Sequence, residues 1–196
     1  MLKLVMNSCV SFILIMLAAC GMTNEHNKMD HSYNQDHEAT EVSEVAVDSL
    51  SVELKNTKGE KVGIAALTEE KNGVRIKLQA EGLAPGRHGF HIHEIGKCEQ
   101  PDFKTAGEHY NPFSREHGFK NPKGPHAGDL PNIEVDANGK ASVETFASLV
   151  TLQQGKPNSL LDVDGSAVII HEQADDYKTN PAGNSGDRIA CGVVAK

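Results

Sequence analysis

Residues 61–94 read KVGIAALTEEKNGVRIKLQAEGLAPGRHGFHIHE, and apolar and polar side chains alternate along much of this stretch. Successive side chains of a β-strand point to opposite faces, so this alternation is typical of strands with one buried face. The runs are separated by EKNG (70–73) and APG (84–86), whose residues favour tight turns. The stretch therefore predicts three consecutive strands, and the last of them carries histidines.

The same pattern continues on both sides of this stretch. The further strand-like runs are VAVDSLSVEL (45–54), NIEV (132–135), KASVETF (140–146), GSAVIIHE (165–172) and RIACGVVA (188–195). About eight short strands with almost no helical periodicity predict an antiparallel sandwich or flattened barrel. Two long irregular segments, 96–130 and 172–187, interrupt the strands, and loops of this length in a compact domain usually carry function.

The N-terminal residues 1–19 have the composition of a secretory signal. Their apolar run, residues 10–17, is broken only by one serine and is too short for a membrane-spanning helix, which needs ~20 residues. The ending LAACG (17–21) resembles a bacterial lipoprotein signal, in which Cys20 is acylated and becomes the new N-terminus. The alternative is an ordinary cleavage site with an incidental cysteine. We expect export and a lipid anchor on the extracytoplasmic side of a bacterial membrane.

These features divide the chain into three parts. We expect a signal peptide at 1–19, a lipidated cysteine with a flexible polar tether at 20–44, and one domain at 45–196. The tether is nearly free of aliphatic side chains and cannot bury enough surface to fold. The tether contains three histidines, His26, His31 and His37. Imidazoles suit copper, so the tether is a candidate copper-binding segment. The alternative is a solvated linker in which these histidines are incidental.

The charge of the chain limits its partners. With 19 basic and 27 acidic residues, the formal net charge is −8. The basic residues form no stripe, which argues against nucleic acid as a partner. The net charge itself is typical of an ordinary soluble surface.

Two cysteines remain in the predicted domain once the signal and the lipid anchor are set aside. These are Cys98 and Cys191. In a chain exported to an oxidising compartment, disulfides persist, so we expect a bridge between them. Two buried free thiols are the alternative.

Seven of the ten histidines lie in the predicted domain. On a strand, residues two apart share a face, so His91 and His93 point the same way and can grip one metal ion. His88 has the opposite parity and is expected to be a structural hydrogen-bonding residue. From this spacing alone, metal binding and a structural role are about equally open for the two histidines.

The first long loop supplies a second set of candidate ligands. Three imidazoles and one carboxylate suit a tetrahedral zinc ion; they are His109, His117, His126 and Asp129. Chance histidines in a polar loop are the alternative. His171 ends an apolar strand and is placed to complete the pair on residues 91 and 93. Nitrogen-only ligation favours copper, so two metals are expected, although spacing does not decide between redox and hydrolytic chemistry.

The motifs RHGFHIHEIGKC (87–98), GEHYNP (107–112), HAGDLPN (126–132), HEQADD (171–176) and GNSGDRIACGV (183–193) occur in this order. In this order they resemble copper/zinc superoxide dismutase across 45–196, and with the lipoprotein signal they resemble a bacterial member. The resemblance implies an eight-stranded antiparallel Greek-key barrel or sandwich. It assigns His91, His93, His109 and His171 to copper, and His109, His117, His126 and Asp129 to zinc, with one ion of each per chain.

The resemblance also implies roles around the metals. Asp175 matches the carboxylate that links a copper ligand to a zinc ligand, Arg188 matches the arginine at the copper channel, and the two cysteines match the family disulfide. It implies disproportionation of superoxide to O₂ and H₂O₂ by alternating Cu²⁺ and Cu⁺, with His109 as a bridging imidazolate that takes up a proton. A non-catalytic metal-handling lipoprotein is the alternative, and a homodimer is possible. Glu108 departs from the family pattern, which more often has proline or a small residue there.

Overall fold

A computed structural model describes residues 48–196 of the chain. The predicted signal, the lipidated cysteine and the tether lie outside the described residues. The described chain holds β-strands and one short 3₁₀ helix. The strands are β1 (Ser49–Asn56), β2 (Lys61–Glu70), β3 (Gly73–Ala80), β4 (Gly86–His88), β5 (Phe90–His93), β6 (Ile133–Val135), β7 (Ala141–Ala147), β8 (Ser166–His171) and β9 (Arg188–Val194), and the helix is η1 (Lys104–Ala106). Over these residues, no helix has the length and hydropathy of a membrane span.

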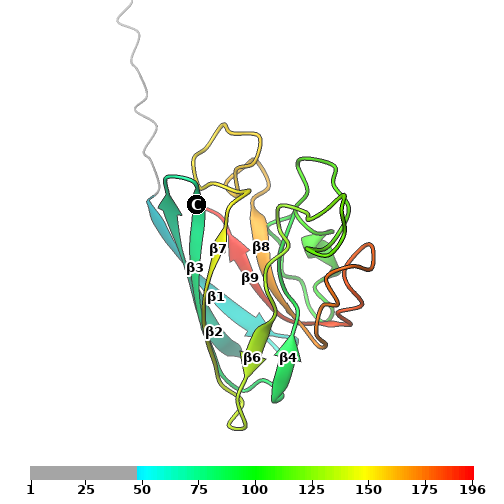
Figure 1. Cartoon of the computed structure of the whole chain (residues 1–196). Coiled ribbons are helices and arrows are strands. Elements are labelled where there is room, and N and C mark those ends of the chain that lie inside the picture. Colours follow the sequence, from blue (N-terminus) through cyan, green and yellow to red (C-terminus); the bar gives the residue numbers. More distant parts are fainter. Residues whose placement is uncertain (1–47) are drawn as a thin grey trace, which may run out of the picture. The chain divides into compact units, whose positions relative to one another are not determined.

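Seven of the strands form one curled antiparallel sheet in the order β5-β8-β9-β1-β2-β3-β7 (Figure 1). The other two strands, β4 and β6, pair with each other in a second, smaller sheet. The all-β antiparallel fold predicted from the alternation is therefore confirmed. The Greek-key connection stays a prediction.

The described residues contain nine strands instead of the predicted eight, because the run 87–94 is divided at Gly89. On one side of this glycine β4 pairs with β6, and on the other side β5 pairs with β8. A Cβ at position 89 would lie only 2.9 Å from Cβ of Ser185, so glycine permits the close approach of the second long loop. The chain thus changes sheets within the histidine-rich run, which parity counting did not anticipate.

The core lies on the inner side of the curled seven-stranded sheet. Alternate side chains of β1, β2 and β3 are buried, such as Leu54, Leu67 and Ile76, while their neighbours face solvent. Strand β8 is buried at every residue, because it contacts the main core on one face and a smaller cluster around Phe103 on the other. Its continuous apolar run therefore has a direct structural cause.

Two long connections meet beside β5 and β8. The segment 94–132 contains only η1, and the segment 172–187 contains no regular element. They are joined by hydrogen bonds, including one of 2.7 Å from the His117 N–H to Asn180 Oδ1 and one of 2.9 Å from the Lys120 N–H to the carbonyl of Tyr177. A third irregular segment, 148–165, was not singled out by the sequence and holds none of the candidate ligands.

Candidate metal centre

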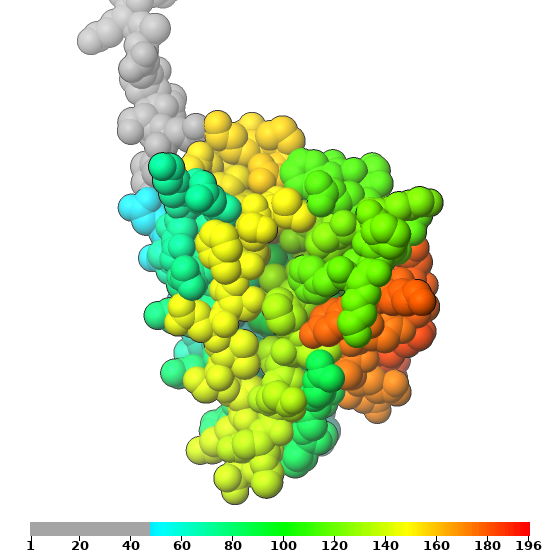
Figure 2. Space-filling view, viewed as in Figure 1, coloured from blue at the N-terminus to red at the C-terminus, as the bar shows by residue number. Residues whose placement is uncertain are grey.

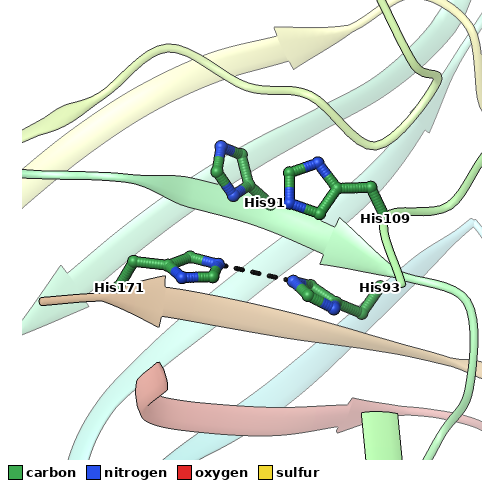
Figure 3. Close-up of side chains that lie close together, drawn as sticks. All are labelled: His91, His93, His109 and His171. Atoms are coloured by element: carbon green, nitrogen blue, oxygen red, sulfur yellow. Dashed lines mark hydrogen bonds between the residues drawn. The ribbon is translucent and has the colours of Figure 1, made fainter. Parts of the chain in front are cut away.

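Strands β5 and β8 bring three histidines together on one side of the sheet. Phe90 and Ile92 of β5 belong to the core, so the alternating His91 and His93 face away from it. Their ring centroids lie 4.8 Å and 5.6 Å from that of His171, which ends β8 (Figure 3). All three rings are buried.

A fourth histidine enters from the long segment after β5. His109 forms an isolated antiparallel bridge with His93, and its ring centroid lies 4.1 Å from that of His91. In these four residues, one ring nitrogen of each lies within 4.8 Å of the others. We call this set, His91, His93, His109 and His171, the four-histidine group.

Hydrogen bonds decide which nitrogen of each ring faces the centre of this group. His93 Nδ1 donates to the carbonyl of Gly107 over 3.0 Å, His171 Nδ1 lies 3.3 Å from a backbone carbonyl, and His91 Nε2 lies 2.9 Å from Asp175 Oδ2. The opposite nitrogens are left for the centre. Nε2 of His93 and Nε2 of His171 face each other at 3.4 Å.

A second group forms on the other side of His109, around the carboxylate of Asp129. Oδ1 of Asp129 lies 2.8 Å from His109 Nδ1, 3.0 Å from His117 Nδ1 and 3.4 Å from His126 Nδ1. Its Oδ2 accepts the backbone N–H groups of Gly118 and His126, which fixes the carboxylate. We call these four residues the mixed group. His109 belongs to both groups: its Nδ1 faces Asp129 of the mixed group, and its Nε2 faces the four-histidine group.

Asp175 connects the two groups from behind. Its Oδ2 lies 2.9 Å from His91 Nε2 and its Oδ1 lies 3.0 Å from His117 Nε2. A carboxylate in this place fixes the orientation of both rings and makes them better ligands. Gly183 allows this contact, because a Cβ at that position, where φ is +66°, would overlap the Asp175 carboxylate.

Both groups fit metal ions by their hydrogen-bonding state. Among the described residues, three buried side-chain atoms lack a hydrogen-bond partner, and all three are ring nitrogens of these groups: His91 Nδ1, His109 Nε2 and His126 Nδ1. A buried polar atom without a partner costs roughly 1–3 kcal/mol, so such atoms call for a ligand. Four imidazoles suit copper, and three imidazoles with one carboxylate suit zinc.

Burial keeps most of these rings in the form that binds metal. Burial and the neighbouring His91 lower the pKa of His109 to about 3, and burial with the same neighbour lowers the pKa of His171 to about 2. Burial opposes protonation of His117 as well, but its hydrogen bonds to Asp129 and Asp175 raise its pKa to about 9. At neutral pH the four-histidine group is therefore ready for metal, whereas His117 releases a proton when zinc binds.

We expect the stability of the metal-free protein to fall as the pH drops below about 6.5. The unfolded chain protonates its histidines near that pH, but folded His109 and His171 do so only near pH 3 and 2, so the unfolded state binds more protons. Each contributes a loss of up to ~1.4 kcal/mol per pH unit in this window. His117 has the opposite sign: its contribution is fully present below about pH 6.5 and is lost as the pH rises from there through about 9. Urea unfolding with a chelator between pH 8 and 5 checks this, and a flat profile would contradict it.

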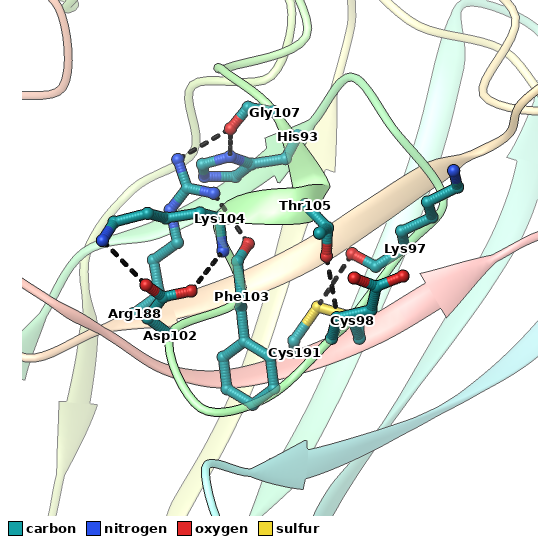
Figure 4. Close-up of a disulfide and its surroundings, with 11 residues drawn as sticks. His93, Lys97, Cys98, Asp102, Phe103, Lys104, Thr105, Gly107, Arg188 and Cys191 are labelled. Atoms are coloured by element: carbon teal, nitrogen blue, oxygen red, sulfur yellow. Dashed lines mark hydrogen bonds and ion pairs between the residues drawn. A yellow bond between two sulfur atoms is a disulfide. The ribbon is translucent and has the colours of Figure 1, made fainter.

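Arg188 lies at the edge of the four-histidine group. Its guanidinium donates to the carbonyls of Phe103 and Gly107 over 2.8 and 2.7 Å (Figure 4). The Gly107 carbonyl also accepts the His93 Nδ1 proton, so one backbone group positions the arginine and a candidate copper ligand. Arg188 is half-buried, and burial lowers its pKa while the charge of Glu108 acts to raise it.

The predicted disulfide is confirmed, with the Cα atoms of Cys98 and Cys191 5.7 Å apart. It joins the segment that carries Gly107 to β9, the strand that begins with Arg188 (Figure 4). His88 lies outside both groups. Its Nδ1 is 2.7 Å from the carbonyl of His171 and its Nε2 is 2.8 Å from that of Ala84, the arrangement of a structural histidine.

The structure brings the predicted ligand residues into two groups, and it adds residues that the sequence did not single out. Besides Gly183 and the Gly107 carbonyl, these include Asn132, which exchanges two 2.8 Å hydrogen bonds with the backbone of Asp175. Asn132 is the last residue of the motif HAGDLPN, and this was the one feature of the sequence that could have pointed to its role. Its partner lies 43 residues away, and that distance concealed its role.

We expect Asp175→Asn to weaken zinc binding by about 10- to 100-fold, the usual effect of losing a carboxylate behind a metal-binding histidine. An amide keeps the shape but cannot accept from both His91 and His117 through two carboxylate oxygens. Competition with a zinc chelator measures the affinity. Asp176→Asn is the matched control, since the carboxylate of Asp176 is exposed and hydrogen-bonds within its own loop. Equal affinities for Asp175→Asn and the unchanged protein would contradict this role.

A curled antiparallel β-sheet with two adjacent histidine groups that share one imidazole defines a candidate two-metal protein. The family model described as copper/zinc superoxide dismutase (SODC) matches residues 61–194. The chain belongs to this family.

Individual relatives agree with this membership. Superoxide dismutase [Cu-Zn] 1 of Aquifex aeolicus is 53% identical over 153 residues, which cover 74% of this chain and 90% of the relative. Superoxide dismutase-like protein YojM of Bacillus subtilis is 46% identical over 184 residues, 93% of this chain and 94% of the relative. Among solved structures, a double mutant of a SOD-like protein from B. subtilis matches with a TM-score of 0.73 and 53% identity, covering 74% of this chain and 97% of that one.

Proposed function

We propose that this protein is a copper/zinc superoxide dismutase that converts superoxide to O₂ and H₂O₂. The observation that carries the proposal is His109, whose two ring nitrogens face different ligand groups in a member of this family. The four-histidine group would hold copper, and the mixed group would hold zinc. When bound, copper supplies one-electron redox chemistry toward superoxide, and zinc supplies a fixed positive charge.

The residues of the chain prepare the site for a small anion. Arg188 supplies positive charge beside the four-histidine group, held in place by two backbone carbonyls. Asp175 fixes the rings of His91 and His117. His109 Nε2 is buried and has no hydrogen-bond partner among the described residues, so it is an atom at which the chain holds either a ligand bond or a proton.

The test compares the protein loaded with copper and zinc with the protein loaded with zinc alone. We expect superoxide removal only in the first preparation, with one copper and one zinc per chain. The absence of activity at that stoichiometry would contradict the proposal and would favour a metal-handling protein. That alternative is weakened by the four-histidine group, in which every predicted residue is present and buried.

We also propose that the protein is an exported lipoprotein, with a signal peptide at 1–19 and a lipid on Cys20 that holds the domain at the extracytoplasmic membrane surface. The support is the sequence LAACG (17–21) after a short apolar run. We expect Cys20→Ser to move the protein from the membrane fraction to the soluble fraction. If the variant stays in the membrane fraction, the lipid is not the anchor. A homodimer stays a prediction.

We expect Glu108→Gln to raise the rate of superoxide removal about two-fold at low salt and to have little effect at high salt. Glu108 is exposed and follows Gly107, to which Arg188 is bound, so its charge opposes that of the arginine. The control is Glu81→Gln, which removes the same charge from an exposed residue directly after β3, a strand that carries no candidate ligand. A rate change no larger than that of the control would contradict this effect.

A further inference from the structure

The two long loops carry exposed aromatic side chains, and one of these packs between the loops. Phe113 and Phe119 are 45% and 49% exposed and both belong to the segment 111–125. The ring of Phe119 packs 5.7 Å from that of Tyr177 in the facing segment. In Figure 2 the segment 111–125 is the bright green corner beside the orange atoms of residues 172–187. Among the described Phe and Tyr residues, Phe90, Phe103 and Tyr110 are buried, so the exposed aromatic side chains outside this region are limited to Phe146.

Cationic side chains accompany these rings. The guanidinium carbon of Arg115 lies 5.8 Å from the ring centroid of Phe113, and Lys120 Nζ lies 5.4 Å from that of Tyr177. The one carboxylate within 111–125, that of Glu116, accepts a 3.0 Å hydrogen bond from Lys123. In the facing segment the exposed Asp176, whose carboxylate is hydrogen-bonded within its own loop, is the neighbour of Tyr177 and Lys178. Arg115, Lys120, Lys123 and Lys178 outnumber Glu116 and Asp176, so this surface is positive on a chain of net charge −8. We call it the loop patch, and it consists of Phe113, Arg115, Phe119, Lys120, Tyr177 and Lys178.

The loop patch is held in place by the metal centre beneath it. His117, between Arg115 and Phe119, is buried and belongs to the mixed group, so this side of the loop faces the candidate zinc site. Asn111 exchanges two hydrogen bonds with the backbone of Arg115, over 2.9 and 3.0 Å. The backbone that carries these side chains is therefore fixed by hydrogen bonds and by a candidate ligand, and a partner meets a loop that is already ordered.

We propose that the loop patch docks onto an anionic phospholipid surface. Aromatic rings favour the headgroup region of a membrane, and lysine and arginine are attracted to its phosphates. The role in the cell rests on the proposed lipid anchor. The proposed acylation site is only 28 residues before the first described residue, Asp48, so a lipidated protein presents the patch to the membrane at high effective concentration.

The experiment uses the chain from residue 21 onward, which lacks the acylation site and is loaded with copper and zinc. The core and both ligand groups lie within 48–196, so the domain is kept. Co-sedimentation is measured with vesicles of phosphatidylglycerol and phosphatidylcholine, and with vesicles of phosphatidylcholine alone. We expect at least about five-fold more binding to the anionic vesicles, with a loss of binding as salt increases.

Matched variants locate the contact. We expect Phe113→Ser with Phe119→Ser, and separately Lys120→Gln with Lys178→Gln, to lower binding to anionic vesicles at least about three-fold. Phe146→Ser is the aromatic control, because Phe146 is 39% exposed and also lies beneath an arginine, 5.5 Å from Arg75 Cζ. Lys77→Gln with Lys140→Gln is the charge control. Both controls should bind as the unchanged protein does, and metal content and melting temperature show that each variant is folded.

Equal binding to neutral and anionic vesicles, or an equal loss in the controls, would overturn the proposal. Self-association that disappears in the phenylalanine variant, without vesicle binding, would assign the patch to a second copy of this chain and would also overturn it. Because these assays contain no acyl group and do not measure superoxide removal, their failure is distinct from failure of the lipid anchor or of the enzyme proposal.

Discussion

His93→Gln should reduce superoxide removal by more than ~100-fold while one zinc per chain is retained. Loss of a residue behind a ligand already costs up to about that factor, and His93 is a candidate ligand itself. Its Nε2 faces the centre of the four-histidine group, and it belongs only to that group. Metal analysis and the activity assay are made on the same preparation.

The control for this variant is His88→Gln. His88 is also a buried histidine, but both of its ring nitrogens lie beside backbone carbonyls and it belongs to neither group. We expect this change to lower stability and to leave copper binding in place. Full activity of His93→Gln, or loss of zinc from it, would show that the division into two groups is wrong.

Replacing both bridged cysteines, by Cys98→Ser with Cys191→Ser, should destabilise the protein by ~4–5 kcal/mol in the chain-entropy description of a disulfide. The bridge closes a loop with a sequence separation of 93 residues, which is the reason for the large expected effect. For a domain of this size the melting temperature should fall by roughly 10 °C or more. Scanning calorimetry of the metal-loaded protein measures the change.

The same variant tests how the disulfide acts on the site. The bridge holds the segment that presents the carbonyls of Phe103 and Gly107 to Arg188. With the bridge removed, we expect the rate of superoxide removal at low temperature to fall by a larger factor than the zinc affinity. The reason is that the Gly107 carbonyl positions both Arg188 and His93, and neither belongs to the mixed group. A decrease of less than 3 °C in melting temperature would contradict the expected stabilisation.

The sequence predicted the all-β fold and the membership of the ligand groups for different physical reasons. Alternation reports burial of one strand face, and that local property identified β1, β2 and β3 well. Residue chemistry and spacing already suggested a zinc set in the first long loop and placed His171 with the pair on β5, and the resemblance to a known family added His109 to the copper set. Spacing alone left the metal and structural roles of His91 and His93 open.

The features that the sequence did not predict depend on contacts between distant segments. The division of the histidine-rich strand at Gly89 follows from the approach of Ser185, almost a hundred residues later. The Gly107 carbonyl has no side-chain signature, yet it orients both His93 and Arg188. Backbone acceptors and close approaches of this kind become visible only when the chain is folded.

The most direct test of the two-metal account is a crystal structure of the copper- and zinc-loaded protein with anomalous scattering measured at both absorption edges. We predict a copper peak among His91 Nδ1, His93 Nε2, His109 Nε2 and His171 Nε2, and a zinc peak among the mixed group, with His109 between them. A single metal, or copper bound away from the four-histidine group, would contradict the account.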